Sequence, residues 1–98
     1  MKLQRLPQMD AEVDEALAYY RAIDPGLGKR FAREMLSAIE RVEHMPMSWR
    51  AIGQGCRRCA LKVFPYLVIY AVEGDAIVLI ALANMHRQPD YWRDRLAD

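Results

Sequence analysis

Cysteine and histidine are scarce in this chain of 98 residues, which has two of each. A structural zinc site takes four such ligands, and the histidines, His44 and His86, stand apart from the single Cys-x-x-Cys formed by Cys56 and Cys59. A redox-active pair would begin a helix, whereas the residues after Cys56 alternate as in a strand. Three residues of strand separate two Cα atoms by about 10 Å, too far for a disulfide. We expect free thiols, no metal and no cofactor.

The sequence also lacks a long hydrophobic run and a strong net charge. The longest apolar stretch, Ala76 to Ala83, is far shorter than the roughly 18 residues of a membrane helix. The first seven residues contain no apolar core of signal-peptide length, so we expect a cytoplasmic protein that does not contact a membrane. The formal net charge is +1, so nucleic-acid binding would have to rest on a local basic patch.

Helical periodicity dominates the first half of the chain. Residues 1–6 suit an edge strand that ends at Pro7, and a helix is expected from Asp10, as its N-cap, to Ile23. Asp24 and Pro25 can start a second helix, whose apolar residues recur at threes and fours as far as His44. The short link favours an antiparallel helical hairpin.

Strand periodicity dominates the second half. Residues 46–55 are expected to be loop, residues 58–63 alternate, and residues 67–72 are β-branched or aromatic. A hairpin turn at 73–75 leads to the apolar strand 76–83, and residues 89–96 suit a short final helix. Helices followed by strands predict an α+β fold in one domain, 1–98: an N-terminal strand and a helical hairpin packed on a small, mostly antiparallel sheet.

Charge is unevenly distributed along the chain. No acidic residue lies between Glu43 and Glu73, a stretch that carries four cations, Arg50, Arg57, Arg58 and Lys62. Another basic cluster follows the last strand: His86, Arg87, Arg93 and Arg95. Two interpretations stay open, because these cations suit either an anionic partner or the protection of an exposed edge strand against aggregation.

The unbroken apolar strand 76–83 implies that both faces of the sheet are covered. The helical hairpin can cover one face. The other is left to the C-terminal segment, where Tyr91 and Trp92 could fold over it, or to a second protein.

Four pieces of the sequence resemble the RelE/ParE toxin superfamily, particularly its ParE-like, plasmid-stabilisation branch. Ala18-Tyr19-Tyr20 followed by Pro25 to Phe31 is similar to the junction of its two helices, and Gly55 to Arg58 is similar to its G-x-R-R entry into the sheet. Phe64 to Tyr70 resembles its F-P-Y hairpin, and His86 to Arg95 resembles its C-terminal ending, here with Arg directly after His. The pieces occur in the family's order and span nearly the whole chain.

The resemblance implies the toxin of a type II toxin–antitoxin system, held inactive in a hetero-oligomer by a cognate antitoxin that wraps it. Such a toxin arrests growth when expressed alone, through one of two targets. We favour a non-enzymatic inhibitor of DNA gyrase; the alternative is a ribosome-dependent endoribonuclease acting on mRNA.

The resemblance and the charge pattern together nominate three sets of residues. The candidates for antitoxin binding are Arg57, Arg58 and Lys62. The candidates for target binding are Tyr91, Trp92, Arg93 and Arg95. For a nuclease, which needs a proton acceptor, a proton donor and cations on the phosphate, the candidates are His86, Arg87, Tyr91 and Arg57.

Overall fold

A computed structural model describes residues 1–96 of the chain. The order of elements is β1 (Lys2–Arg5), α1 (Pro7–Ile23), α2 (Pro25–His44), β2 (Arg50–Gly53), β3 (Cys56–Ala60), β4 (Tyr66–Glu73), β5 (Ala76–Asn84) and a 3-10 turn, η1 (Arg93–Arg95). The five strands form one sheet in the order β1-β5-β4-β3-β2, antiparallel except where β1 runs parallel to β5. The predicted α+β fold is therefore confirmed.

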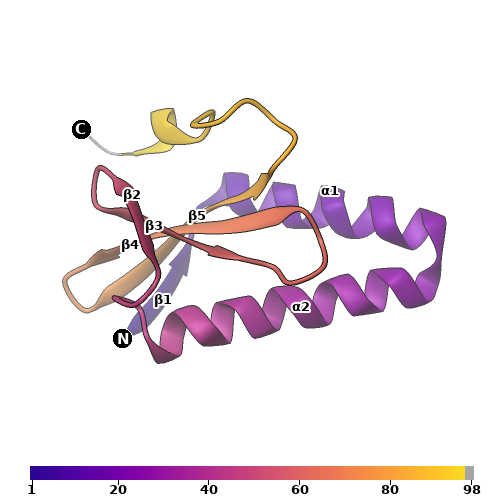
Figure 1. The fold of residues 1–98 in the computed structure, drawn as a ribbon, viewed down its shortest axis with the longest axis horizontal. Coiled ribbons are helices and arrows are strands. Elements are labelled where there is room, and N and C mark those ends of the chain that lie inside the picture. Colours follow the sequence, from indigo (N-terminus) through magenta and orange to yellow (C-terminus); the bar gives the residue numbers. More distant parts are fainter. Residues whose placement is uncertain (97–98) are drawn as a thin grey trace.

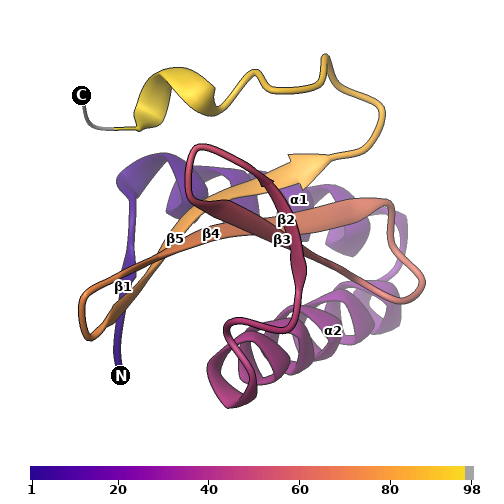
Figure 2. The same ribbon diagram turned by 60° about the vertical axis from the view of Figure 1, so that its left-hand side comes forward.

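The sheet lies between two unlike covers (Figures 1 and 2). Helices α1 and α2 form the predicted antiparallel hairpin against one face, and the chain after β5 crosses back over the other. We call these the helix face and the outer face, and we call residues Met85 to Leu96 the C-terminal segment. No helix among the described residues is both long and apolar enough to span a membrane.

The turn between the helices agrees with the sequence. The Asp24 carboxylate accepts a hydrogen bond from the Leu27 N–H (3.1 Å) and caps α2, with Pro25 in the first turn. Gly28 lies where the helices approach closely, because a Cβ there would come within 2.5 Å of Arg21 Cγ. Larger residues at position 28 would push the hairpin apart.

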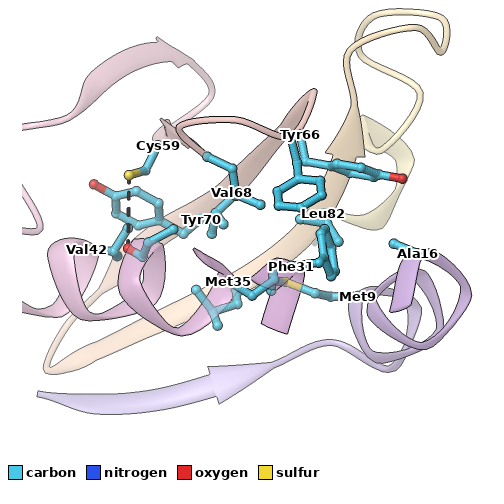
Figure 3. Close-up of a cluster of buried hydrophobic side chains, with 14 of the residues drawn as sticks. Met9, Ala16, Phe31, Met35, Val42, Cys59, Tyr66, Val68, Tyr70 and Leu82 are labelled. Atoms are coloured by element: carbon cyan, nitrogen blue, oxygen red, sulfur yellow. Dashed lines mark hydrogen bonds between the residues drawn. The ribbon is translucent and has the colours of Figure 1, made fainter. Parts of the chain in front are cut away.

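The helix-face core is apolar and aromatic (Figure 3). Phe31 stacks on Tyr20 with ring centroids 5.1 Å apart and meets Phe64 and Tyr66 edge-on at 5.2 and 5.5 Å. Cys59 and Tyr70 from the sheet pack beside Val42 of α2. Such ring geometries add to the stabilisation that burial of the rings itself provides.

The central strands bury residues on both faces, as the apolar run in β5 predicts. Register shifts between Ile69 and Tyr70, so that Ile69 pairs with Ala81 and Tyr70 with Leu79. Ile80 has no partner of its own at this bulge, and both Ile80 and Ala81 belong to the outer-face core. Of the two predicted covers for this face, the C-terminal segment is present, with Trp92 packed in the outer-face core.

Four predicted boundaries are wrong. Helix α1 begins at Pro7 rather than Asp10, since proline suits the first helical turn, and Asp10 instead pairs with Arg5 (3.2 Å). Strand β2 lies inside the stretch expected to be loop, because four residues are too few for a periodic signal. The expected C-terminal helix is only the turn η1, and Asp90, with a φ of 66°, interrupts the segment before it.

The alternation predicted over 58–63 also ends early, at Ala60. Both cysteines are free and buried. They lie three residues apart on one strand, so Cys59 joins the helix-face core while Cys56 joins the outer-face core.

Candidate functional site on the outer face

The backbone groups along the edge of β5 are satisfied in two different ways. Its first half pairs with β1, from Ala76 to Leu79. Beyond Leu79, side chains take over: the Leu82 N–H donates to Glu12 Oε1 (3.1 Å), and Arg95 Nη1 donates to the Ile80 carbonyl (3.2 Å). The Tyr91 hydroxyl lies 3.4 Å from the Leu82 carbonyl. Helix α1 and the C-terminal segment therefore satisfy backbone groups that a strand would otherwise pair.

Glu12 of α1 is the point at which the C-terminal segment is attached. Its carboxylate accepts hydrogen bonds from Arg95 Nη1 (2.8 Å), Arg95 Nη2 (3.1 Å) and the Tyr91 hydroxyl. Arg87 Nη1 lies 3.7 Å away. The side chains of Glu12 and Arg95 are only 12% and 13% exposed, so this bidentate ion pair is largely shielded from water.

Contacts with Glu12 and burial change the acid–base behaviour of the segment. Burial, followed by the hydrogen bond to Glu12, raises the pKa of Tyr91 to about 12. The hydrogen bond to Glu12 likewise raises the pKa of Arg95. Guanidinium groups also lie over the Tyr91 ring, with Arg87 Cζ at 3.9 Å and Arg95 Cζ at 5.2 Å from its centroid. Tyr91 is therefore neutral at physiological pH, with its proton directed at Glu12.

Residues Trp92 and Arg93 of the segment contact the β2–β3 hairpin and the core beneath it. Trp92, 3% exposed, packs in the outer-face core with Cys56, Ile69 and Ile80. Arg93 lies over the Trp92 ring at 4.4 Å and donates to the Ile52 carbonyl (2.6 Å) and to Gln54 Oε1 (2.7 Å). Arg93 and Arg95 thus hold the C-terminal end of the segment, Arg93 to the β2–β3 hairpin and Arg95 to Glu12.

A cleft of about 290 Å³ remains between the C-terminal segment and the sheet. Its apolar lining includes Leu67, Ile69 and Ala83 from the two central strands. Arg58 of β3 and Arg87 of the C-terminal segment also line it. This cleft is the part of the outer face that the segment leaves open.

The three candidates for antitoxin binding do not share one surface. Arg57 and Arg58 are neighbours on a strand and point to opposite faces. Arg57 donates to the Trp49 carbonyl (2.7 Å), on the helix side, while Arg58 lines the outer cleft. Lys62 lies beyond β3, where its backbone N–H donates to Glu34 Oε1 (3.1 Å).

The four nuclease candidates are also divided. Arg87 and Tyr91 lie together, and the neighbouring His86 is exposed; the backbone N–H of His86 donates to Asn84 Oδ1 (2.8 Å). Arg57 is on the other side of the sheet. Among the target-binding candidates, Trp92 and Arg95 are mostly buried, and Tyr91 and Arg93 are partly exposed.

Sequence reasoning missed Glu12, which the pattern indicated only as an acidic residue near a helix start. A usable signal was present, because Glu12 lies three residues after Met9 and four before Ala16, both of which are buried. A carboxylate within an apolar helical stripe needs buried donors, and arginines are the best suited to provide them.

The described chain is thus a helical hairpin packed on a small mixed sheet, with a basic segment folded back over the sheet. The model of the family described as "ParE toxin of type II toxin-antitoxin system, parDE" matches residues 4–91, and the chain belongs to this family. It is thus the toxin component of a type II toxin–antitoxin system.

Comparison with solved structures agrees with the family assignment at the level of the fold. A chain of the structure titled "Chromosomal ParDE TA system from P. aeruginosa" is similar with a TM-score of 0.66 and 15% identity. The match covers 88% of this chain and 97% of that one. No curated protein matches the sequence.

Proposed function

We propose that this toxin inhibits DNA gyrase by binding it, in the cytoplasm, and does not cleave RNA. The observation that carries the proposal is the state of Tyr91. Its hydroxyl donates to Glu12 within the toxin, so its proton is already engaged and is not directed at a substrate. Arg57, the other expected contributor, faces away from it. A binding inhibitor needs no converging acid–base pair.

We place the gyrase contact on the C-terminal segment. Trp92 and Arg95 are the mostly buried members of the predicted set, and Tyr91 and Arg93 are its partly exposed members, although both also help to hold the segment. Arginine and tyrosine are enriched among residues that dominate binding energies at protein interfaces. Arg93 is the single test, with the Tm of its variant measured alongside, because its guanidinium also donates to the Ile52 carbonyl and pairs with Asp90.

A gyrase supercoiling assay and a ribosome-programmed mRNA cleavage assay on one preparation test the target. We expect inhibition of supercoiling, or accumulation of cleaved DNA on gyrase, with intact mRNA. Arg93→Gln should weaken inhibition about tenfold or more, as expected for an interface arginine. Arg33→Gln, at an exposed position of α2, is the matched control and should leave it unchanged.

Codon-specific mRNA cleavage that His86→Ala or Arg87→Ala abolishes would contradict the gyrase proposal and indicate the ribonuclease. In cells, expression of the toxin alone should arrest growth, and co-expression of the cognate antitoxin should restore it. Normal growth with abundant folded toxin would count against any growth-arresting activity.

A further inference from the structure

Strands β2 and β3 place two arginines directly opposite each other. Arg50 pairs with Arg58 in the antiparallel register, and cross-strand partners point to the same face of a sheet. Like charges in this position destabilise the sheet. Neither guanidinium has an ion-pair partner within residues 1–96. The fold therefore keeps an uncompensated positive pair on its outer face.

One member of this pair, Arg58, lies at the cleft between the sheet and the C-terminal segment, and Arg50 is its neighbour on β2. Arg58 lines the cleft, and Arg87 lines it from the segment. Arg87 is only loosely held by Glu12, at 3.7 Å with 56% of its side chain exposed, so it can turn to another anion. Asp90, which also borders the cleft, is engaged by Arg93 Nε at 2.9 Å.

The cleft floor selects among anions. Beside Arg58 and Asn84, its sheet lining is aliphatic and includes Leu67, Ile69 and Ala83. Of the two aromatic residues that line it, Trp92 is buried and Tyr91 has Arg87 against its ring at 3.9 Å, so neither ring is open for stacking. A nucleic-acid strand would use exposed aromatic platforms and a continuous basic track. A peptide with a carboxylate next to an apolar side chain matches both features of the cleft, since arginine binds carboxylates in a bidentate manner.

We propose that the cleft is a docking site for the antitoxin, occupied by an Asp or Glu that binds Arg58 and Arg87 while a neighbouring apolar side chain packs on Leu67 and Ile69. Arg50 strengthens the positive potential that attracts this carboxylate. The proposal rests on the antitoxin part of the toxin's function and is independent of the gyrase target. It keeps Arg58 of the predicted set and adds Arg87, because both line this cleft.

Binding of the purified cognate antitoxin to variants of the full-length toxin, followed by titration calorimetry at several salt concentrations, tests the site. Arg58→Gln and Arg87→Gln should each raise Kd about 10- to 100-fold and make binding less sensitive to salt. Arg58→Gln also removes the repulsion between positions 50 and 58. The Tm of this variant without antitoxin should therefore be unchanged or higher by up to about 4 °C. Arg33→Gln is the control. Arg33 is exposed on α2, which covers the other face of the sheet, so this variant should bind the antitoxin with the affinity of the wild type.

Affinity that is unchanged in both variants overturns the proposal. The proposal is also overturned if Arg58→Gln lowers both the affinity and the Tm while Arg87→Gln leaves the affinity unchanged, because Arg58 would then have a structural role.

Charge reversal gives an independent readout. Arg58→Glu toxin should bind poorly, and changing one antitoxin Asp or Glu to Lys should restore its binding. Failure to restore binding at every acidic position of the antitoxin contradicts the site. A short DNA duplex serves as the second probe, and stronger loss of duplex binding than of antitoxin binding would assign the cleft to nucleic acid instead. Inhibition of gyrase by the free toxin is measured separately, so the two proposals can fail independently.

Discussion

The two faces of the sheet are covered in different ways. On the helix face, two regular helices bury an apolar layer in which aromatic rings such as Phe31 and Tyr66 meet. On the outer face, an irregular segment with one 3-10 turn covers the sheet around a single large anchor, Trp92. That segment is attached mainly by arginines that bind Glu12 and the β2–β3 hairpin.

The difference in chemistry predicts a difference in cooperativity. Hydrophobic burial is spread over many atoms, so losing one contact on the helix face weakens the whole domain. Hydrogen-bonded charges concentrate their contribution in few atoms, so a single substitution can release the outer cover. The C-terminal segment should therefore open locally while the sheet and helices stay folded.

The largest effect is expected in the middle of the helix face. Phe31→Ala removes a fully buried ring that contacts Tyr20, Phe64 and Tyr66, and it should lower the free energy of unfolding by about 3–5 kcal/mol. Urea denaturation followed by circular dichroism measures this loss. Leu36→Ala is the control, because Leu36 is on the same helix and exposed, and it should stay within about 0.5 kcal/mol of wild type. Equal effects at both positions would contradict the packing described for α2.

The second-largest effect is expected where the C-terminal segment is attached to Glu12. Glu12→Gln keeps the side-chain shape and removes the charge that Arg95 and Tyr91 contact, which should cost about 2 kcal/mol. Hydrogen exchange should show lost protection in residues 85–96 before any loss in α2. Glu15→Gln changes an exposed carboxylate of the same helix and serves as control. Uniform loss of protection over the whole chain would refute the separate opening of the segment.

The same contrast explains which features could be predicted from sequence. The hairpin and central strands follow from the periodicity of residues such as Phe31 and Ile77, because a covered face requires a repeating apolar position. The outer cover depends on contacts between positions about 80 residues apart, such as Glu12 and Arg95, which leave no local pattern. The site residues were therefore only partly predictable. Arg57 and Arg58 are adjacent in the sequence, but they point to opposite faces of the sheet.

Alkaline pH should destabilise the packing on both faces of the sheet. A change at Tyr91 separates the contribution of the outer face to this loss of stability. Its pKa is raised from 10.0 to about 12, so the folded state holds the proton more tightly than the unfolded chain. The resulting stabilisation is complete below pH 10 and is lost as the pH rises towards about 12. Tyr66 and Tyr70, whose pKa values burial also raises to about 12, add the same dependence on the helix face.

Tyr91→Phe should therefore reduce, but not abolish, the fall in stability between pH 10 and about 12. Urea denaturation at a series of pH values measures the slope, and phenolate absorbance should lose one ionisation with a midpoint near 12. An unchanged slope in Tyr91→Phe would mean that Tyr91 titrates alike in the folded and unfolded chains.

The smallest effect is expected from the outermost arginine bound to Glu12. Arg87 and Arg95 approach the same carboxylate, at 3.7 and 2.8 Å, with 56% and 13% of their side chains exposed. An exposed ion pair contributes less than about 1 kcal/mol because water screens it, so Arg87→Gln should barely change the unfolding free energy. Arg95→Gln should cost about 2 kcal/mol, since it removes the bidentate ion pair with Glu12 and the donor to the Ile80 carbonyl. Denaturation of the two variants side by side measures the contrast. Equal losses would show that Arg87 also holds the segment, and the cleft would then lack an arginine free to bind a partner.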